Sequence, residues 1–275
     1  TWTREVDWGY LGGPAIPGPI GGVAMSSDGL YAAIVGTNGP ATLRVRTRSG
    51  TTWSGETIGW TGPAGENPAG MPVAFDGTAA RAVLGGAWGA SAGPDSGVAR
   101  VLVRSGTTWT QEAVLVPAGL APGDRLGFAV DVSDDGLVAI VGAPYDDVAA
   151  SADVGSVHVF VRSGATWAEE AVLVGGAAGD AFGYSVSIDG DGNRALAGAP
   201  EDDTASGTGA GSVHVLVRTG TTWTDEAALL HAGAAPSDRF GVSVAISADG
   251  LRGVAGARDD DTTGTDAGTA RAFSI

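Results

Sequence analysis

The chain of 275 residues is long enough to bury a large hydrophobic core, and its composition argues against several kinds of function. It contains no cysteine, which excludes disulfides, thiol nucleophiles and cysteine-ligated metals. All 15 basic residues are arginine, and the formal net charge of −16 argues against nucleic acid as a partner, because phosphate binding needs a basic surface. No apolar stretch approaches the length of a membrane span, so we expect no membrane insertion.

A single phrase, Arg-(Ser/Thr)-Gly-x-x-Trp-x-x-Glu, recurs along the chain. The complete copies occupy residues 48–56, 104–112, 162–170 and 218–226, and the tail of a fifth copy lies at residues 1–5. A glycine that follows a hydrophobic residue or alanine marks each unit, at positions 21, 70, 127, 183 and 241. Units of roughly 50 residues that are filled with short strands and turns are typical of propeller blades.

These units predict an all-β fold: a five-bladed β-propeller of four-stranded antiparallel blades, forming one domain over residues 1–275. The expected blades cover approximately residues 20–60, 69–116, 126–174, 182–230 and 240–275. The chain begins and ends within a repeat, so we expect residues 1–8 to supply the outer strand of the fifth blade and close the ring. Closure would leave only short sheet edges exposed.

The third unit illustrates one blade. Residues 127–132 alternate as a strand does, and Asp135-Gly136 then supplies a tight turn. A second strand over 138–144 ends at a proline, which cannot donate to a sheet, and strands over 157–161 and 167–174 follow. The tryptophans of the repeated phrase stand in fourth strands, where we expect them to pack between blades: Trp2, Trp53, Trp109, Trp167 and Trp223.

Short motifs within the units resemble those of a known repeat family. Phe-Gly occurs at 182–183 and 240–241, and Gly-Ala-Pro occurs at 142–144 and 198–200. In the first two units the match is weaker: residues 20–21 and 69–70 replace Phe-Gly, and residues 36–38 and 86–88 replace Gly-Ala-Pro. Over its whole length the chain therefore resembles the FG-GAP repeat proteins, which include the integrin α-chain head and many secreted bacterial proteins. The resemblance implies an extracellular binding or adhesion module. Integrin heads have seven blades and this chain has five units, so the geometry of integrin partners is not implied.

The resemblance also implies candidate calcium sites, because integrin-like repeats often bind Ca²⁺ in the turn between the first two strands of a blade. That loop reads Asp-x-Asp-x-Asp-Gly with a further acidic residue at its ninth position, since Ca²⁺ takes six or more oxygen ligands. Two loops keep part of the pattern, with Asp131 and Asp135 in the third unit and Asp189 and Asp191 in the fourth. Both lack the ninth acidic residue, so ordinary turn hydrogen bonding is the competing interpretation. The sequence requires no cofactor, and calcium is the one candidate.

Acidic loops mark one face of the predicted ring. The loops between second and third strands carry Asp146 and Asp147 in the third unit and Asp202 and Asp203 in the fourth. The alternation of strand direction puts these loops beside the connections between blades, which are also acidic. A site for a cation or a basic partner is one interpretation, and solvated loop charge that caps turn amides is the other.

Aromatic residues that break the repeat point to the same face. They are Trp8, Tyr10, Trp60 and Trp88. Residues that depart from a structural repeat are where a function can be added without harm to the scaffold. We hypothesise an aromatic platform that stacks on a sugar ring or on an apolar side chain of a partner. Hydrophobic plugging between irregular blades is the alternative.

The sequence argues against an enzyme. Among the strands expected to line the central channel only Asp131 is acidic, whereas glycosidases need two converging carboxylates. His158 and His214 stand where other units have arginine, which does not ligate metals, and His231 is a lone loop residue without a recognisable partner. We therefore expect a secreted or surface-displayed bacterial module for non-catalytic adhesion to a protein or glycan at a cell surface. A carbohydrate-binding lectin is the alternative, and a polysaccharide-active enzyme comes third.

Overall fold

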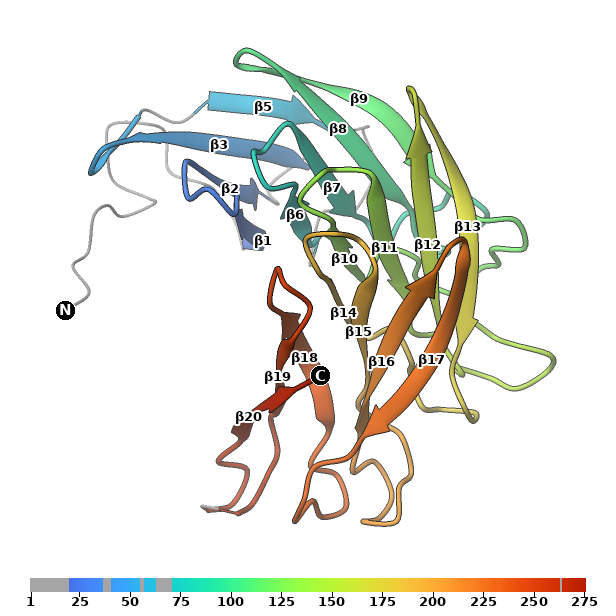
Figure 1. Cartoon of the computed structure of the whole chain (residues 1–275). Helices are drawn as coiled ribbons and strands as arrows, with labels where there is room; N and C mark the ends of the chain where they lie inside the picture. The colour runs from blue at the N-terminus through green and yellow to red at the C-terminus, as the bar shows by residue number, and fades with distance from the viewer. Residues whose placement is uncertain (1–19, 37–40, 55–56, 63–70, 263) are drawn as a thin grey trace.

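The computed structural model describes residues 20–36, 41–54, 57–62, 71–262 and 264–275. Over these residues the chain forms twenty β-strands in five antiparallel sheets, arranged side by side around a central axis (Figure 1). The strands of each sheet follow one another in sequence order. None of the described residues belongs to a helix long and apolar enough to span a membrane. The fold is the predicted five-bladed β-propeller.

Each sheet is one blade. The first contains β1 (Ile20–Met25), β2 (Tyr31–Gly36), β3 (Thr42–Ser49), β4 (Thr52–Trp53) and β5 (Thr57–Thr61); the second contains β6 (Val73–Phe75), β7 (Arg81–Gly85), β8 (Ala99–Ser105) and β9 (Thr108–Leu115). The third contains β10 (Ala129–Val132), β11 (Val138–Ala143), β12 (Ser156–Ser163) and β13 (Thr166–Val174); the fourth contains β14 (Ser185–Ile188), β15 (Arg194–Ala199), β16 (Ser212–Thr219) and β17 (Thr222–Leu229). The fifth contains β18 (Phe240–Ile246), β19 (Arg252–Ala257) and β20 (Thr269–Ser274). In the first blade β4 and β5 both pair with β3, so its outer strand is in two pieces.

Serine and aspartate side chains build the turns between the first two strands of the blades. In the third blade the carboxylate of Asp135 accepts hydrogen bonds from the Ser133 hydroxyl (2.6 Å) and from the backbone N–H of Leu137 (2.9 Å). The same arrangement recurs at Asp28 and Asp249. The Asp-Gly pairs of the sequence are thus hairpin turns with a side-chain cap.

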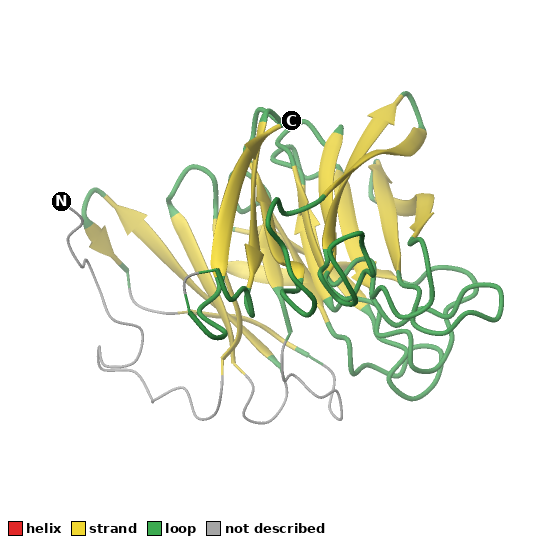
Figure 2. Cartoon of the chain, turned by 90° about the horizontal axis from the view of Figure 1, so that it is seen from below, coloured by secondary structure: helices red, strands yellow, loops and turns green. Residues whose placement is uncertain are grey.

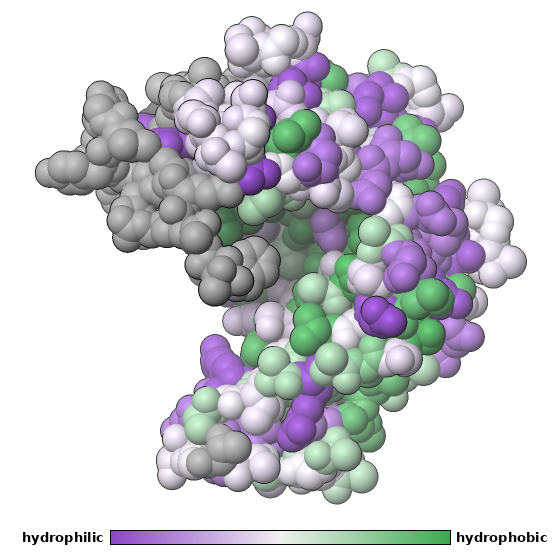
Figure 3. Space-filling model, turned by 60° about the vertical axis from the view of Figure 1, so that its left-hand side comes forward, coloured by the Kyte–Doolittle hydropathy of each residue, from purple (hydrophilic) through white to green (hydrophobic). Residues whose placement is uncertain are grey.

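Backbone hydrogen bonds between successive blades run around the central channel. They join the hairpin turns of neighbouring blades, from the N–H of Gly77 to Asp134, from that of Asp134 to Gly190 and from that of Gly190 to Ala248, each 3.0 Å long. The inner strands β1, β6, β10, β14 and β18 line a cavity of about 310 Å³ on this axis. In the space-filling view the molecule is hollowed in its middle, and hydrophobic residues line part of the hollow (Figure 3).

The hydrophobic core lies between blades. Each cluster of buried side chains combines residues of neighbouring sheets, as Ile140 of the third blade and Leu216 of the fourth illustrate. Trp109 and Trp223 of the repeated phrase are 4% and 7% exposed, which confirms their predicted place in the core, and Trp167 is half-buried. Each blade is therefore stabilised chiefly by its neighbours, as is usual in repeat proteins.

The repeated phrase joins neighbouring blades through its arginine, tryptophan and glutamate. The carboxylate of Glu112, in the outer strand of the second blade, accepts hydrogen bonds from the guanidinium of Arg162 (2.6 Å) and the indole N–H of Trp167 (3.1 Å) in the third. Glu170 of the third blade accepts the equivalent pair from the fourth blade, at 2.7 and 3.2 Å. We call this arrangement the interblade clamp. It gives the phrase a structural role, because the copies at 162–170 and 218–226 each hold the preceding blade.

Among the described residues, no strand pairs with the outer side of β20 in the fifth blade. Its last described strand, β20, has exposed or half-buried side chains, whereas the equivalent strands β12 and β16 are mostly buried. The C-terminus of the chain directly follows this strand (Figure 1). The predicted closing strand, residues 1–8, lies outside the described residues. Its expected place is beside β20.

Candidate ligand-binding face

The loops between second and third strands and the connections between blades lie together on one face, which we call the loop face. Gly155, in the loop of the third blade, forms a parallel bridge with Phe182 in the next connection. Figure 2 shows the long loops gathered on one side of the strands. Burial raises the pKa of Asp124 in an earlier connection, and the charges of Asp146 and Asp147 raise it further. The predicted adjacency of acidic loops and connections is confirmed.

Aromatic side chains and one arginine form a continuous group on this face. The guanidinium of Arg125 lies 4.2 Å from the ring centroid of Trp88 and 4.4 Å from that of Tyr145. The ring centroid of Phe128 lies 6.0 Å from that of Tyr145 and 4.7 Å from that of Tyr184. All five side chains are half-buried. We call them the aromatic–arginine patch, and it extends from the second to the fourth blade.

Arg125 occupies a repeated backbone position with a left-handed conformation. Its φ is 56°, and the equivalent residues of the next two connections, Ala181 and Arg239, have φ values of 55° and 56°. The guanidinium of Arg239 also lies between two loop residues, but these are acidic: Glu201 at 2.9 Å and Asp259 at 3.1 Å. The backbone therefore repeats while the flanking side chains change from aromatic to acidic around the ring. Such a change on a constant scaffold is typical of a binding position in a repeat protein.

The structure separates the aromatic residues that the sequence singled out. Trp88 belongs to the patch. Trp60 is half-buried and packs against the core cluster between the first two blades, as the plugging alternative expects. Trp8 and Tyr10 lie outside the described residues. The other four members of the patch were missed by the sequence analysis, although two of them directly follow the marker glycine of their units, which is a usable signal.

Some carboxylates of the acidic loops accept hydrogen bonds from backbone N–H groups of the same loop. Asp147 and Asp203 each accept a hydrogen bond of 2.9 Å from a backbone N–H six residues further along the chain. Asp146 and Asp202 are half-buried near the aspartates of the connections. The loops are thus ordered by their own carboxylates, and they give the patch an anionic border.

The two loops with part of the calcium pattern direct their carboxylates to different partners. Asp131 points into the channel, whereas Asp135 caps its own turn. Asp189 accepts hydrogen bonds from two backbone N–H groups of its own turn, at 2.8 and 3.1 Å, and Asp191 is exposed. The bonds that these loops make are those of ordinary turns. Calcium binding here stays a prediction.

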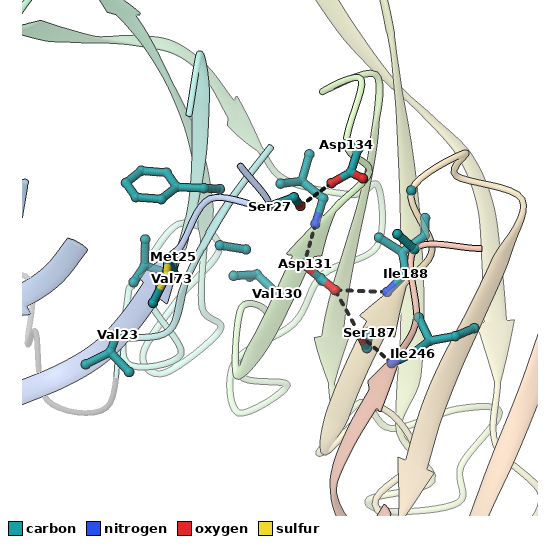
Figure 4. Close-up of a pocket in the computed structure, with 16 residues that line it drawn as sticks. Val23, Met25, Ser27, Val73, Val130, Asp131, Asp134, Ser187, Ile188 and Ile246 are labelled. Carbon is teal, nitrogen blue, oxygen red and sulfur yellow. Dashed lines mark hydrogen bonds between the residues drawn. The ribbon is translucent and has the colours of Figure 1, made fainter. Parts of the chain in front are cut away.

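Asp131 links three inner strands across the channel (Figure 4). Its carboxylate accepts hydrogen bonds from the N–H of Ile188 (2.9 Å) and the hydroxyl of Ser187 (3.1 Å), and that hydroxyl accepts one from the N–H of Ile246 (3.2 Å). Burial raises the pKa of Asp131 to about 6, although these hydrogen bonds oppose the shift. Asp134, at the adjoining turn, also lines the cavity, so the channel holds a second carboxylate that the sequence analysis of the strands did not count.

Replacing Asp131 with asparagine is expected to raise stability near neutral pH. The amide oxygen can accept the hydrogen bonds from Ile188 and Ser187, and the side chain carries no charge to bury. The N–H of Val132, which donates to the other carboxylate oxygen at 2.9 Å, loses its acceptor, and this reduces the gain. The pKa of Asp131 in the folded chain is about 6, against an ordinary value of 3.8, so ionisation costs wild-type stability as the pH rises through this interval. The gain in Asp131→Asn is at most about 3 kcal/mol at pH 8 and disappears below about pH 4, where the carboxyl is protonated in both states.

Urea unfolding of both proteins at the two pH values measures this difference. Asp191→Asn, at an exposed turn position, is the control and should change stability much less. If Asp131→Asn has a native circular dichroism spectrum but the same free energy of unfolding as wild type at high pH, burial of this charge does not destabilise the protein.

The histidines are held by specific partners. His158 is buried and bonds to the Ser156 hydroxyl (2.9 Å) and the carboxylate of Glu169 (2.7 Å), and His214 makes equivalent contacts in the fourth blade. The prediction that His231 lacks a partner is wrong. Arg271, from the following blade, donates to its Nε2 at 2.7 Å. The two residues are far apart in sequence, so no local pattern could reveal the pair.

Sheets around a channel, capped turns and the interblade clamp define a β-propeller built from sequence repeats. One glycine in each of the third and fourth units is required by the approach of the next blade: a side chain on Gly142 would collide with the carbonyl oxygen of Gly183, and one on Gly198 with that of Gly241. A sequence model of the FG-GAP repeat matches residues 109–160, 167–216 and 223–273, more than half of the chain. The protein belongs to the FG-GAP repeat family. No curated protein is similar enough in sequence to count as a match.

Proposed function

We propose that this propeller is a non-catalytic binding module that recognises a protein partner at a cell surface through the aromatic–arginine patch. The observation that supports this most is the guanidinium of Arg125 between the rings of Trp88 and Tyr145. Tryptophan, tyrosine and arginine are the side chains that most often dominate the energy of protein interfaces. The three side chains already stack on one another. They therefore lose less conformational entropy when a partner binds.

Charge favours a partner with a basic surface. The chain has a formal net charge of −16, and acidic loops border the patch on the third and fourth blades. An anionic border around an apolar centre attracts a basic partner over distance and raises its association rate. Membership of the FG-GAP family supports an extracellular place of action, which we propose for this protein as well.

A carbohydrate ligand is the second candidate. It is favoured by the half-exposed rings of Trp88, Phe128 and Tyr184, since aromatic faces are suited to the apolar faces of sugar rings. A sugar would use these rings and hydrogen bonds, whereas a basic protein would also use the acidic border. The dependence of binding on salt therefore separates the two ligands.

Changing Trp88 or Tyr145 to alanine is expected to weaken binding by about 30-fold, because each change removes one side of the stack and costs about 2 kcal/mol. The labelled protein is applied to a panel of immobilised basic extracellular proteins and to a glycan array, and the variants are compared on the ligands found. Leu251→Ala is the matched control, since this exposed side chain lies in a hairpin turn on the opposite face.

Binding to a basic protein that weakens with salt and in both variants supports the proposal. A glycan signal that is lost in the same variants and is insensitive to salt selects the lectin instead. Ligand binding that both variants retain at full strength contradicts the use of the patch.

A further inference from the structure

A histidine and two aspartates meet in the interior between the fourth and fifth blades. His231 follows β17, Asp238 lies in the connection to the fifth blade, and Asp260 lies in the loop between β19 and β20. One ligand atom from each residue lies within 4.8 Å of the other two. Their exposed fractions are 5%, 2% and 0%. Carboxylates buried this deeply need hydrogen bonds or a cation to offset the loss of hydration.

The Nδ1 atom of His231 points into this cluster without a partner. It is buried and makes no hydrogen bond, and it lies 3.6 Å from a carboxylate oxygen of Asp260. This separation is too long for a hydrogen bond. It is close to the spacing of about 3.3 Å between two ligand atoms on a tetrahedral ion with bonds of about 2.0 Å. The separation is thus compatible with two ligands of one ion.

Hydrogen bonds from outside the cluster hold both carboxylates in place. One oxygen of Asp260 accepts from the backbone N–H of Thr262 (2.7 Å) and from its hydroxyl, and the other accepts from the hydroxyl of Thr269 (2.6 Å). These bonds also lower the pKa of Asp260 to about 2. Asp238 accepts from the N–H of Ala235 at 2.7 Å. Bonds of this kind orient the ligands of metal sites.

The histidine is an addition to a repeated pair of carboxylates. Pairs equivalent to Asp238 and Asp260 occur at the two preceding blade interfaces, where the second carboxylate of each pair is half-buried. The residue equivalent to His231 is Pro117 at one of these interfaces and Gly175 at the other. The combination of full burial with an imidazole therefore departs from the repeat, as an added function does.

We propose that His231, Asp238 and Asp260 bind a zinc ion. Zinc is held by imidazole nitrogen and carboxylate oxygen, often with three protein ligands and one open position, whereas calcium takes oxygen ligands. A cavity of about 450 Å³, lined by His231, Phe240 and Arg271 among others, adjoins the cluster. The cavity reaches the imidazole from the side of Arg271, which bonds to Nε2.

The hydrogen bond from Arg271 to His231 weakens the proposed zinc binding. Its Nε–H donates to Nε2 of His231, so the neutral imidazole carries its own proton on Nδ1. Zinc on Nδ1 requires that proton to move to Nε2, which then becomes a donor, and the exposed guanidinium must turn away toward solvent. Arg271→Gln should therefore tighten binding, because the amide oxygen can accept a hydrogen bond from the protonated Nε2.

The test is zinc binding by the full chain after treatment with a chelator. Equilibrium dialysis should give one zinc per wild-type chain, and titration calorimetry should show about 100-fold weaker binding in His231→Ala and Asp260→Asn. Arg271→Gln should bind about 10-fold more tightly than wild type. His214→Ala is the matched control, because this histidine is paired with Asp225 outside the cluster and its loss should leave zinc affinity unchanged.

Zinc binding in natively folded His231→Ala at wild-type strength overturns the proposal, as does a wild-type chain that binds no zinc at micromolar concentration. Should His231→Ala fail to fold, Arg271→Gln decides, because a folding defect cannot tighten binding. Cobalt in place of zinc should give a visible absorption band in wild type that Asp260→Asn weakens.

Discussion

Replacing Glu112 with alanine is expected to lower the free energy of unfolding by about 3–5 kcal/mol, because it breaks a buried charged network from one side. Arg81, Arg162 and Trp167 all donate to this carboxylate, and its side chain is only 9% exposed. The variant leaves two guanidinium groups and an indole N–H without their acceptor. Urea unfolding followed by tryptophan fluorescence measures the loss.

Thr110→Ala, at an exposed position of the same strand, is the control and should stay within about 0.5 kcal/mol of wild type. Burial opposes ionisation of Glu112, but the hydrogen bonds from Arg162, Trp167 and Arg81 outweigh it and lower its pKa to about 2, from an ordinary 4.5. The stabilisation is therefore complete above pH 4.5 and is lost as the pH falls toward 2, so wild type and variant should converge in acid. Equal stability of the two proteins at neutral pH would show that the clamp does not stabilise the ring.

Removing residues 1–8 is expected to lower the melting temperature by about 10 °C or more, since the fifth blade would then keep an open edge at β20. The described side chains of β20 are exposed or half-buried. Glu226 and Ala227 of β17 are exposed, whereas the residues at the same positions of β9 and β13 are half-buried. A strand beside β20 would cover both surfaces. Differential scanning calorimetry of the full and shortened chains measures the change.

The interblade clamp makes the closing contact specific. Glu226 is the fourth-blade equivalent of Glu112 and is exposed. If residues 1–8 complete the fifth blade, the indole of Trp2 donates to Glu226, just as Trp167 donates to Glu112. A double-mutant cycle of Trp2→Phe and Glu226→Gln should then give a coupling of about 1 kcal/mol. Additive effects of the two changes, together with an unaltered melting temperature of the shortened chain, would contradict closure.

The loop face owes its chemistry to variation on a fixed scaffold. The connections after the second, third and fourth blades share one left-handed position, occupied by Arg125, Ala181 and Arg239. The first lies between aromatic rings and the third between carboxylates. The residue that follows this position, Leu126, Phe182 or Phe240, is hydrophobic and buried in all three, so the core contacts are kept. Binding properties of this face can therefore change without loss of the fold.

Sequence reasoning was strong where structure depends on neighbouring positions. The capped turn at Asp135 and the buried Trp109 and Trp223 were predicted, because hairpin turns and strand alternation are set by a few adjacent residues. The sequence predicted less of the aromatic–arginine patch. Trp60 repeats no pattern and still packs into the core, and Arg125 was passed over because an arginine in a loop carries no signal of its own.

The number of blades, their strand order, the places of the turns and the burial of Trp109 and Trp223 were determined by the sequence alone, since a repeated local pattern folds in a similar way each time. Only the tertiary structure decided which side chains of different blades meet. Trp88 reaches Arg125, and His231 reaches Asp260, through the curvature of the ring and the offset between adjacent sheets. Those quantities arise from the packing of whole blades, so no stretch of residues encodes them locally.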